Sequence, residues 1–108
     1  MKYIDSPLYP SPYPSLGMGC TVHYGSSCYP ATIVKVSPSG KTITIQSDEA
    51  RRLGEHDQNS PQVWDIRPDV EGKIETATLR KYGGWKISKS DSLHVVLGTR
   101  SKFIDFGI

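Results

Sequence analysis

The sequence has few cysteines, no long apolar run and little net charge, and each shortage excludes a class of protein. Two cysteines, Cys20 and Cys28, are too few for the disulfide framework of a small secreted domain. No stretch approaches the roughly 20 apolar residues that a membrane-spanning helix requires. A formal net charge of +2, from 13 basic and 11 acidic side chains, excludes a polycation that binds long nucleic acids mainly by charge.

The chain also lacks a recognisable signal peptide, because Met1 to Ile4 is followed at once by Asp5 and several prolines. We therefore expect a soluble protein of the reducing cytoplasm with two free thiols, and a bridge between Cys20 and Cys28 is the alternative. A length of 108 residues with 36% hydrophobic content is enough for one modest core and one domain.

Proline and tyrosine are concentrated near the N-terminus, in the stretch "DSPLYPSPYPSLG". Proline lacks a backbone donor and has a fixed φ, which excludes a helix or a central strand here. We predict an extended tail over residues 1–16, followed by a single domain over residues 17–108. The spacing Pro7-x-x-Pro10 fits a ligand for aromatic-lined grooves. The alternative is a tail whose tyrosines pack on the domain or on a neighbouring copy.

From Cys20 onward the apolar residues alternate with polar ones, which is the pattern of β-strands. The runs "YPATIVKV" and "KTITIQSD" flank the turn "SPSG", and together they predict a β-hairpin with Ile43 and Ile45 pointing inward. Strict alternation would place Thr32, Val34 and Val36 on one face and Ile33 and Lys35 on the other.

The rest of the chain continues this pattern with one interruption. We predict an exposed loop over residues 49–62, with at most one helical turn near Ala50. Further strands are expected in "VWDIRPDV", "KIETATLRKY", "GWKIS", "LHVVLG" and "KFIDFGI", with Gly83-Gly84 as a two-residue hairpin turn. The fold class is therefore all-β, a small SH3-like barrel or curled antiparallel sheet of six to eight short strands.

The order of residues from 17 to 46 resembles the opening of SH3-like small barrels of the Tudor and KOW type. The positions that carry the resemblance are Gly17, Gly19, Val22, Tyr24, Tyr29, Pro30, Ala31, Val34, Gly40 and Ile43. Tudor barrels use an aromatic cage with an acidic residue, so the resemblance implies that Tyr24, Tyr29 and Trp64 converge.

The phrases "YPATIVKVSPSGK" and "TLRKYGGWK" also resemble small uncharacterised proteins of bacteriophages and other mobile elements, over roughly residues 17 to 87. This second resemblance implies a viral protein that acts in the host cytoplasm. It also suggests, as a hypothesis, that the protein sequesters a host immune signal.

Reactive side chains are present without a supporting motif. Cys20, His23 and Cys28 are three soft ligands in nine residues, but an odd offset places Cys20 and His23 on opposite faces of a strand, so we expect no metal site. Cys28 near His23 is the best nucleophile–base pair, with Asp48 or Asp65 as the orienting acid. Because no catalytic motif surrounds them, we expect a protein without a cofactor that is not an enzyme.

Positive charge and aromatic rings alternate densely only in "LRKYGGWKISK". There Arg80, Lys81, Tyr82, Trp85 and Lys86 are predicted to stack a base and neutralise a phosphate. The alternative is a solubilising hairpin with Trp85 turned into the core.

A second candidate anion site is Arg51-Arg52, since arginine offers a planar fork that matches phosphate. The alternative is that Asp48 and Glu49 neutralise both arginines. These features predict a non-enzymatic binder of a small anionic, nucleotide-like ligand. A protein-binding adaptor and a weak single-stranded nucleic-acid module are the alternatives. Because small barrels with exposed edges often pair, we also expect a homo-oligomer with the ligand at the subunit interface.

Overall fold

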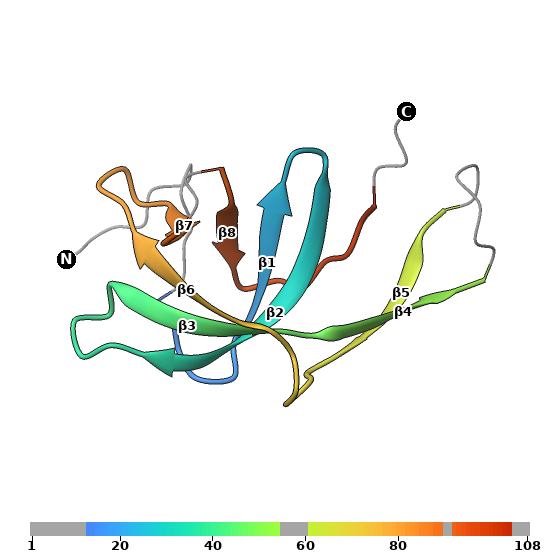
Figure 1. Ribbon diagram of the computed structural model, residues 1–108, viewed down its shortest axis with the longest axis horizontal. Helices are drawn as coiled ribbons and strands as arrows, with labels where there is room; N and C mark the ends of the chain where they lie inside the picture. Colours follow the sequence, from blue (N-terminus) through green and yellow to red (C-terminus); the bar gives the residue numbers. More distant parts are fainter. Residues whose placement is uncertain (1–12, 55–60, 90–91, 105–108) are drawn as a thin grey trace.

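The computed structural model describes residues 13–54, 61–89 and 92–104, and in this part of the chain every regular element is a β-strand. Six strands close into an antiparallel barrel in the order β1-β2-β3-β6-β7-β8, and two more form a separate two-stranded sheet, β4-β5 (Figure 1). The barrel strands are β1 (Gly19–Tyr24), β2 (Ser27–Val36), β3 (Thr42–Ser47), β6 (Ile74–Leu79), β7 (Trp85–Ile87) and β8 (His94–Leu97). The all-β prediction and a small closed barrel compatible with the SH3-like type are therefore confirmed.

Alternating side chains fill the barrel, as the two-residue period of a strand requires. The inward positions on neighbouring strands lie opposite each other, for example Ile33 and Ile45 across β2 and β3. β8 closes the barrel against β1, where Val95 is paired with Val22. The buried residues that form the core cluster are Cys20, Val22, Ala31, Ile33, Ile43, Ile45, Ala77, Trp85, Ile87, Val95 and Leu97. One continuous apolar core thus holds six short strands together.

The β2–β3 hairpin is present where it was predicted, and Ile43 and Ile45 are buried. Alternation fails in β2, because a β-bulge shifts the register between Ile33 and Lys35. A bulge adds one residue to one strand, so Val34 is exposed while Val36 packs against the core. The expectation that Val34 and Val36 share a face is therefore wrong.

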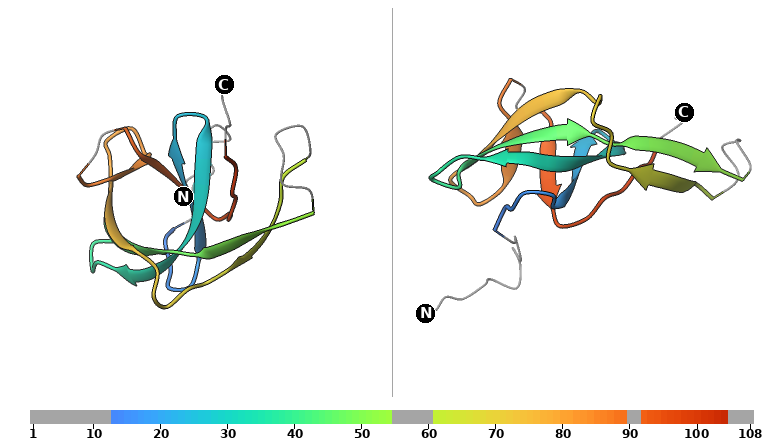
Figure 2. Two further views of the ribbon diagram at one scale, coloured as in Figure 1. Left: turned by 45° about the vertical axis from the view of Figure 1, so that its right-hand side comes forward. Right: turned by 90° about the horizontal axis from the view of Figure 1, so that it is seen from below.

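The predicted loop over residues 49–62 is wrong in its first part, where β4 (Glu49–Leu53) pairs with β5 (Val63–Arg67). β4 follows β3 after a single residue, Asp48, and the β4–β5 sheet projects beyond the barrel (Figures 1 and 2). We call this two-stranded sheet the wing.

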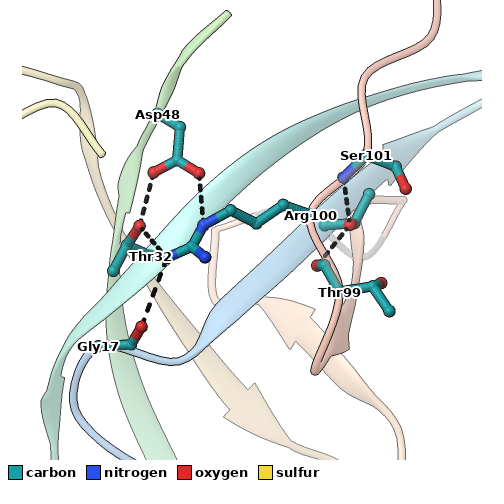
Figure 3. A network of polar contacts seen from close by, with 7 residues as sticks. Gly17, Thr32, Asp48, Thr99, Arg100 and Ser101 are labelled. Atoms are coloured by element: carbon teal, nitrogen blue, oxygen red, sulfur yellow. Dashed lines mark hydrogen bonds and ion pairs between the residues drawn. The ribbon is translucent and has the colours of Figure 1, made fainter. Parts of the chain in front are cut away.

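A polar network joins the wing to the barrel at Asp48 (Figure 3). The Asp48 side chain has 0% exposure, and its carboxylate accepts hydrogen bonds from Arg100 Nε at 3.0 Å and from Thr32 Oγ1 at 2.6 Å. The Arg100 side chain crosses over Gly19, where an added Cβ would lie 2.6 Å from Arg100 Cγ. Arg100 also donates from Nη2 to the Gly17 carbonyl at 3.4 Å. The network therefore fixes the segment after β8 across β1, β2 and the start of the wing.

The last predicted strand is reduced, within the described residues, to one isolated bridge between Phe103 and Cys28. Both backbone bonds of this bridge are formed, at 2.9 and 3.0 Å. The next residue, Ile104, is held at its backbone N–H and carbonyl by the side-chain amide of Gln62. The segment thus runs between the β1–β2 hairpin and the wing (Figure 1). Residues 105–108 of the prediction lie outside the described residues, as do residues 1–12 of the predicted tail.

The turn between β6 and β7 is also longer than predicted. Leu79 is paired with Trp85, and Arg80 N–H bonds the Gly84 carbonyl, so Lys81, Tyr82 and Gly83 form the tip. Gly83 has a φ of 95°, which glycine adopts readily and which ends a three-residue hairpin loop. No helix that could span a membrane was found among the described residues.

Candidate functional site

The outer face of β7, β8 and β1 carries a row of nitrogen-bearing side chains. Lys86 on β7 is the register partner of His94 on β8, and His94 is the partner of His23 on β1. Directly opposite residues in antiparallel strands have Cβ atoms on the order of 5 Å apart, so the three side chains are neighbours. We call this set, together with Lys81 and Tyr82 of the adjoining turn, the basic face.

The turn between β6 and β7 adds an aromatic ring to the basic face. The Tyr82 side chain is 58% exposed, and its ring covers Gly84, where an added Cβ would meet ring carbon Cε1. Gly84 and Lys86 share one side of β7, because the intervening Trp85 points into the core. The ring therefore lies beside Lys86, and glycine at position 84 makes room for it.

Charge on the basic face is of one sign. Lys81, Lys86 and His94 enter no ion pair with any residue in the described part of the chain. The sequences of β1, β7, β8 and the β6–β7 turn contain no carboxylate. Val96, an exposed apolar residue, lies two positions along β8 from His94. Ammonium and imidazole donors beside an aromatic ring and an apolar side chain are suited to an anion with a flat, partly apolar body.

Trp85 is placed differently from the predicted ligand site. Its side chain is 4% exposed and packs in the core opposite Leu79 and Val95. The structure therefore agrees with the alternative in which Trp85 is a core residue. Arg80 follows Leu79, the last residue of β6, at the base of the turn. Lys81 and Tyr82 are exposed, and Lys86 is partly exposed.

Tyr24 and Tyr29 converge, as the Tudor resemblance implied, at the end of the β1–β2 hairpin. Their ring centroids are 5.5 Å apart and the rings are tilted by 54°. Tyr29 Oη donates to Glu75 Oε1 at 2.8 Å, and the Glu75 side chain is 13% exposed. Burial raises the pKa of the Tyr29 phenol above its ordinary value, and the hydrogen bond to Glu75 raises this pKa further. An aromatic pair and a carboxylate therefore meet at one end of the barrel.

Trp64 does not belong to this group. It lies on β5 of the wing, where its indole N–H donates to Gln62 at 3.2 Å. Lys102 Nζ lies 5.6 Å from the centroid of its ring, so Trp64 packs against the segment after β8. Of the three aromatic residues that the resemblance implied, two therefore meet, and Glu75 is the acid beside them.

A groove of about 400 Å³ extends from Glu75 along β6 toward the residues that follow β7. Its lining includes the apolar residues Ile87 and Leu93 and the lysines Lys73 and Lys89. Lys73 Nζ is 3.9 Å from the Glu75 carboxylate. The groove therefore presents both apolar and charged side chains.

Arg51 and Arg52 do not form a joint anion site, because successive residues of β4 point to opposite faces. Arg51 is 3.8 Å from Asp65 on β5, and the expected neutralisation by Asp48 is wrong, because Asp48 is bound to Arg100 instead. Arg52 is on the other face of the wing, the face that also carries Trp64. A hollow of about 230 Å³ on the Arg51 face is lined by Glu49, Arg51, Asp65 and Arg67.

Strand alternation separates Cys20 from the other two reactive residues, His23 and Cys28. The Cys20 thiol points into the core, and burial raises its pKa to about 12, a rise that Asp48 increases and Arg100 opposes. His23 is the register partner of Cys28, so this pair is adjacent as predicted, although Cys28 is a buried strand residue rather than a loop residue. Both thiols are free, and no group of three or more potential metal ligands gathers within the described residues.

No family model, no curated protein and no solved structure matches this chain. The basic face and the tyrosine pair are therefore interpreted from their own chemistry. Sequence reasoning did not include His94 and His23 in a binding site. Their proximity follows from the closure of β8 onto β1, and no local pattern indicates which strands close a barrel.

Proposed function

We propose that this protein is a non-enzymatic binder of a small anionic, nucleotide-like ligand on its basic face. The observation that carries the proposal is the cross-strand row of Lys86, His94 and His23, which adjoins the exposed ring of Tyr82. Phosphate oxygens would accept hydrogen bonds from the row, and the base would stack on Tyr82.

The size of the row argues for a small ligand. A long duplex requires a broad basic stripe, because its affinity comes from many phosphate contacts. Three nitrogen-bearing side chains on adjacent strands match one or two phosphate groups instead. Either imidazole can donate a hydrogen bond to a phosphate oxygen whether or not it is protonated, since neutral histidine keeps one N–H. Binding is therefore expected on both sides of neutral pH.

The proposal includes release of the ligand in unchanged form. Cys28, the nearest nucleophile to His23, is buried, and Asp48 and Asp65 are engaged with arginines elsewhere. A binder that returns its ligand intact fits sequestration of a signalling nucleotide. Such sequestration, in the cytoplasm of a host cell, is the role that the resemblance to phage-type proteins suggests.

Calorimetric titration with ADP-ribose and with 3′,5′-cyclic AMP tests this function. Lys86→Gln and Tyr82→Ala should each weaken binding by about tenfold or more, because each removes one contact of about 1.4 kcal/mol or more. Lys35→Gln is the matched control, since Lys35 is an exposed lysine on β2 and its loss changes the net charge equally. Mass spectrometry of the released ligand should find it unmodified.

Two results would contradict the proposal. The first is that neither nucleotide binds to the folded protein. The second is that Lys35→Gln weakens binding as much as Lys86→Gln, which would mean that the loss of affinity comes from the change in net charge and not from a lost contact. Inorganic pyrophosphate serves as the third ligand, and equal affinity for pyrophosphate and ADP-ribose would exclude stacking on Tyr82.

A second function, recognition of a protein partner, is favoured by the Tyr24–Tyr29–Glu75 group. Two tilted rings beside a carboxylate can hold an organic cation by cation–π attraction, as the Tudor resemblance implied. Titration with a trimethyl-lysine peptide should show binding that Tyr24→Ala abolishes and Tyr82→Ala leaves unchanged. The opposite pattern would place the cation elsewhere.

A further inference from the structure

The wing has two strand edges, and neither is paired with a third strand among the described residues. Two-stranded sheets are marginally stable alone, and an open edge readily pairs with another chain. One face of the wing is charged. Its charged side chains are Glu49 and Arg51 on β4 and their register partners Arg67 and Asp65 on β5, and the exposed pair Leu53 and Val63 follows them on the same face.

The charges on this face alternate in both directions. Glu49 is opposite Arg67, Arg51 is opposite Asp65, and the sign also changes along each strand. Asp65 is the best-neutralised member, with Arg67 at 3.2 Å and Arg51 at 3.8 Å. The Glu49 carboxylate, at the open edge, has no ion-pair partner within the described residues.

We propose that two copies of this chain associate by antiparallel pairing of their β4 edges about a two-fold axis at Ala50. Opposite residues in an antiparallel ladder point to the same face, so the axis must lie midway between the two copies of one residue. An axis at Ala50 places Glu49 opposite Arg51 of the second copy, and this contact occurs twice. The ladder is confined to residues 49–51 of each copy, because on the same edge the Asp48 N–H already donates to the Pro30 carbonyl of β2. The result is a four-stranded sheet, β5-β4-β4-β5, in which alternate signs continue without interruption across all four strands.

Other registers within β4 are less favourable. An axis at Glu49, Arg51 or Arg52 places a side chain opposite the like-charged residue of the second copy. An axis at Leu53 carries most of the pairing beyond the end of β4. Because the charges on either side of Ala50 are complementary to those of a second copy, they favour both self-association and this register.

The interface would leave the proposed ligand face open. The wing and β7 lie at opposite ends of the molecule in Figure 1. The dimer therefore differs from the sequence-based expectation of a ligand bound between subunits. Its test is also independent of ligand binding, because no nucleotide is needed.

Sedimentation of the full chain across a range of protein concentrations measures the association. Wild-type protein should form a dimer that weakens as salt is raised, since the pairs are exposed. Glu49→Arg and Arg51→Glu should each weaken the dimer by about tenfold or more, because each replaces two attractions by two repulsions. Lys35→Glu, an exposed charge reversal on β2, is the control and should leave the dimer unchanged.

Mixing the two variants gives the sharpest test. In the mixed pair, the arginine introduced at position 49 of one copy would lie opposite the glutamate introduced at position 51 of the other. The native Arg51 and Glu49 would form the second contact, so a heterodimer should form with affinity close to wild type. Each variant carries the same unfavourable intrachain contact alone and in the mixture, so recovery reports contact between copies.

Three outcomes would each overturn the proposal. They are a monomeric wild type, single variants that associate as well as wild type, and a mixture no more associated than its components. Circular dichroism confirms that each variant is folded.

Discussion

The Asp48–Arg100 pair should contribute more to stability than any exposed ion pair of this protein. Asp48 is the residue at which β3 ends and the wing begins, and its carboxylate is fully buried. Replacing Arg100 by glutamine removes the cation and leaves a shorter, neutral side chain whose amide ends near the position of Arg100 Nε. The carboxylate then keeps its hydrogen bond from Thr32 but loses the charge that compensates it.

The expected cost follows from burial. Breaking a buried ion pair by removing one partner costs about 3–5 kcal/mol, because the remaining charge stays away from water. The Arg100 side chain is 32% exposed, so water can reach part of the site and the cost should fall to about 2–4 kcal/mol. Domains of this size unfold at about 5–15 kcal/mol, so the loss is a large fraction of the total.

Urea unfolding followed by tryptophan fluorescence, to which the buried Trp85 contributes, measures this loss directly. Arg67→Gln is the matched control, because Arg67 pairs with Asp65 at 3.2 Å but its side chain is 71% exposed, and we expect a cost of about 0–1 kcal/mol. A double-mutant cycle with Asp48→Asn isolates the pairwise energy. If Arg100→Gln were no more destabilising than Arg67→Gln, the importance assigned to the buried pair would be wrong.

Three further predictions concern the barrel interior. Trp85→Ala should destabilise the fold by about 3–5 kcal/mol, as measured by urea unfolding, and a cost below about 1 kcal/mol would be incompatible with a core position. Tyr29→Phe should cost about 0.5–1.5 kcal/mol in the same assay, because Glu75 loses a hydrogen-bond donor, and a stabilised variant would contradict this. The raised pKa of Cys20 predicts stability that is complete below the ordinary value of 9.0 and falls by up to about 1.4 kcal/mol per pH unit as the pH rises toward about 12. Unfolding measured from about pH 8 to about pH 11 should show this decline, and Cys20→Ala should reduce it; equal slopes in both proteins would refute the assignment.

The barrel strands could be predicted because their signal is local. Each has apolar residues two positions apart over at least part of its length, as in "TITI" of β3, and a glycine-containing turn often follows. β4 gave no such signal, because the two apolar residues of "EARRL", Ala50 and Leu53, are three positions apart and lie on opposite faces of the strand. Its strand conformation is stabilised by pairing with β5, which begins ten residues after β4 ends. A short stretch of sequence does not contain both strands, so it cannot indicate that they pair.

The candidate site was predictable only in part, for the same reason. The β6–β7 turn is local, so Lys81, Tyr82 and Lys86 could be identified from their density of charge and rings. His23 and His94 are 71 positions apart and meet through barrel closure. Whether Trp85 points inward depends on how β7 is paired with β6 and with β8. The three-residue turn between β6 and β7 gives a different pairing from the two-residue turn that the sequence predicted.

The most direct test of the proposed ligand site is a nuclear magnetic resonance titration of the full chain with ADP-ribose. Binding to the basic face predicts that backbone amide shifts concentrate on β7, β8, β1 and the β6–β7 turn. It also predicts that the wing and the β2–β3 hairpin stay unchanged. Shifts confined to the wing or to the groove beside Glu75, or no shifts at millimolar ligand, would contradict it.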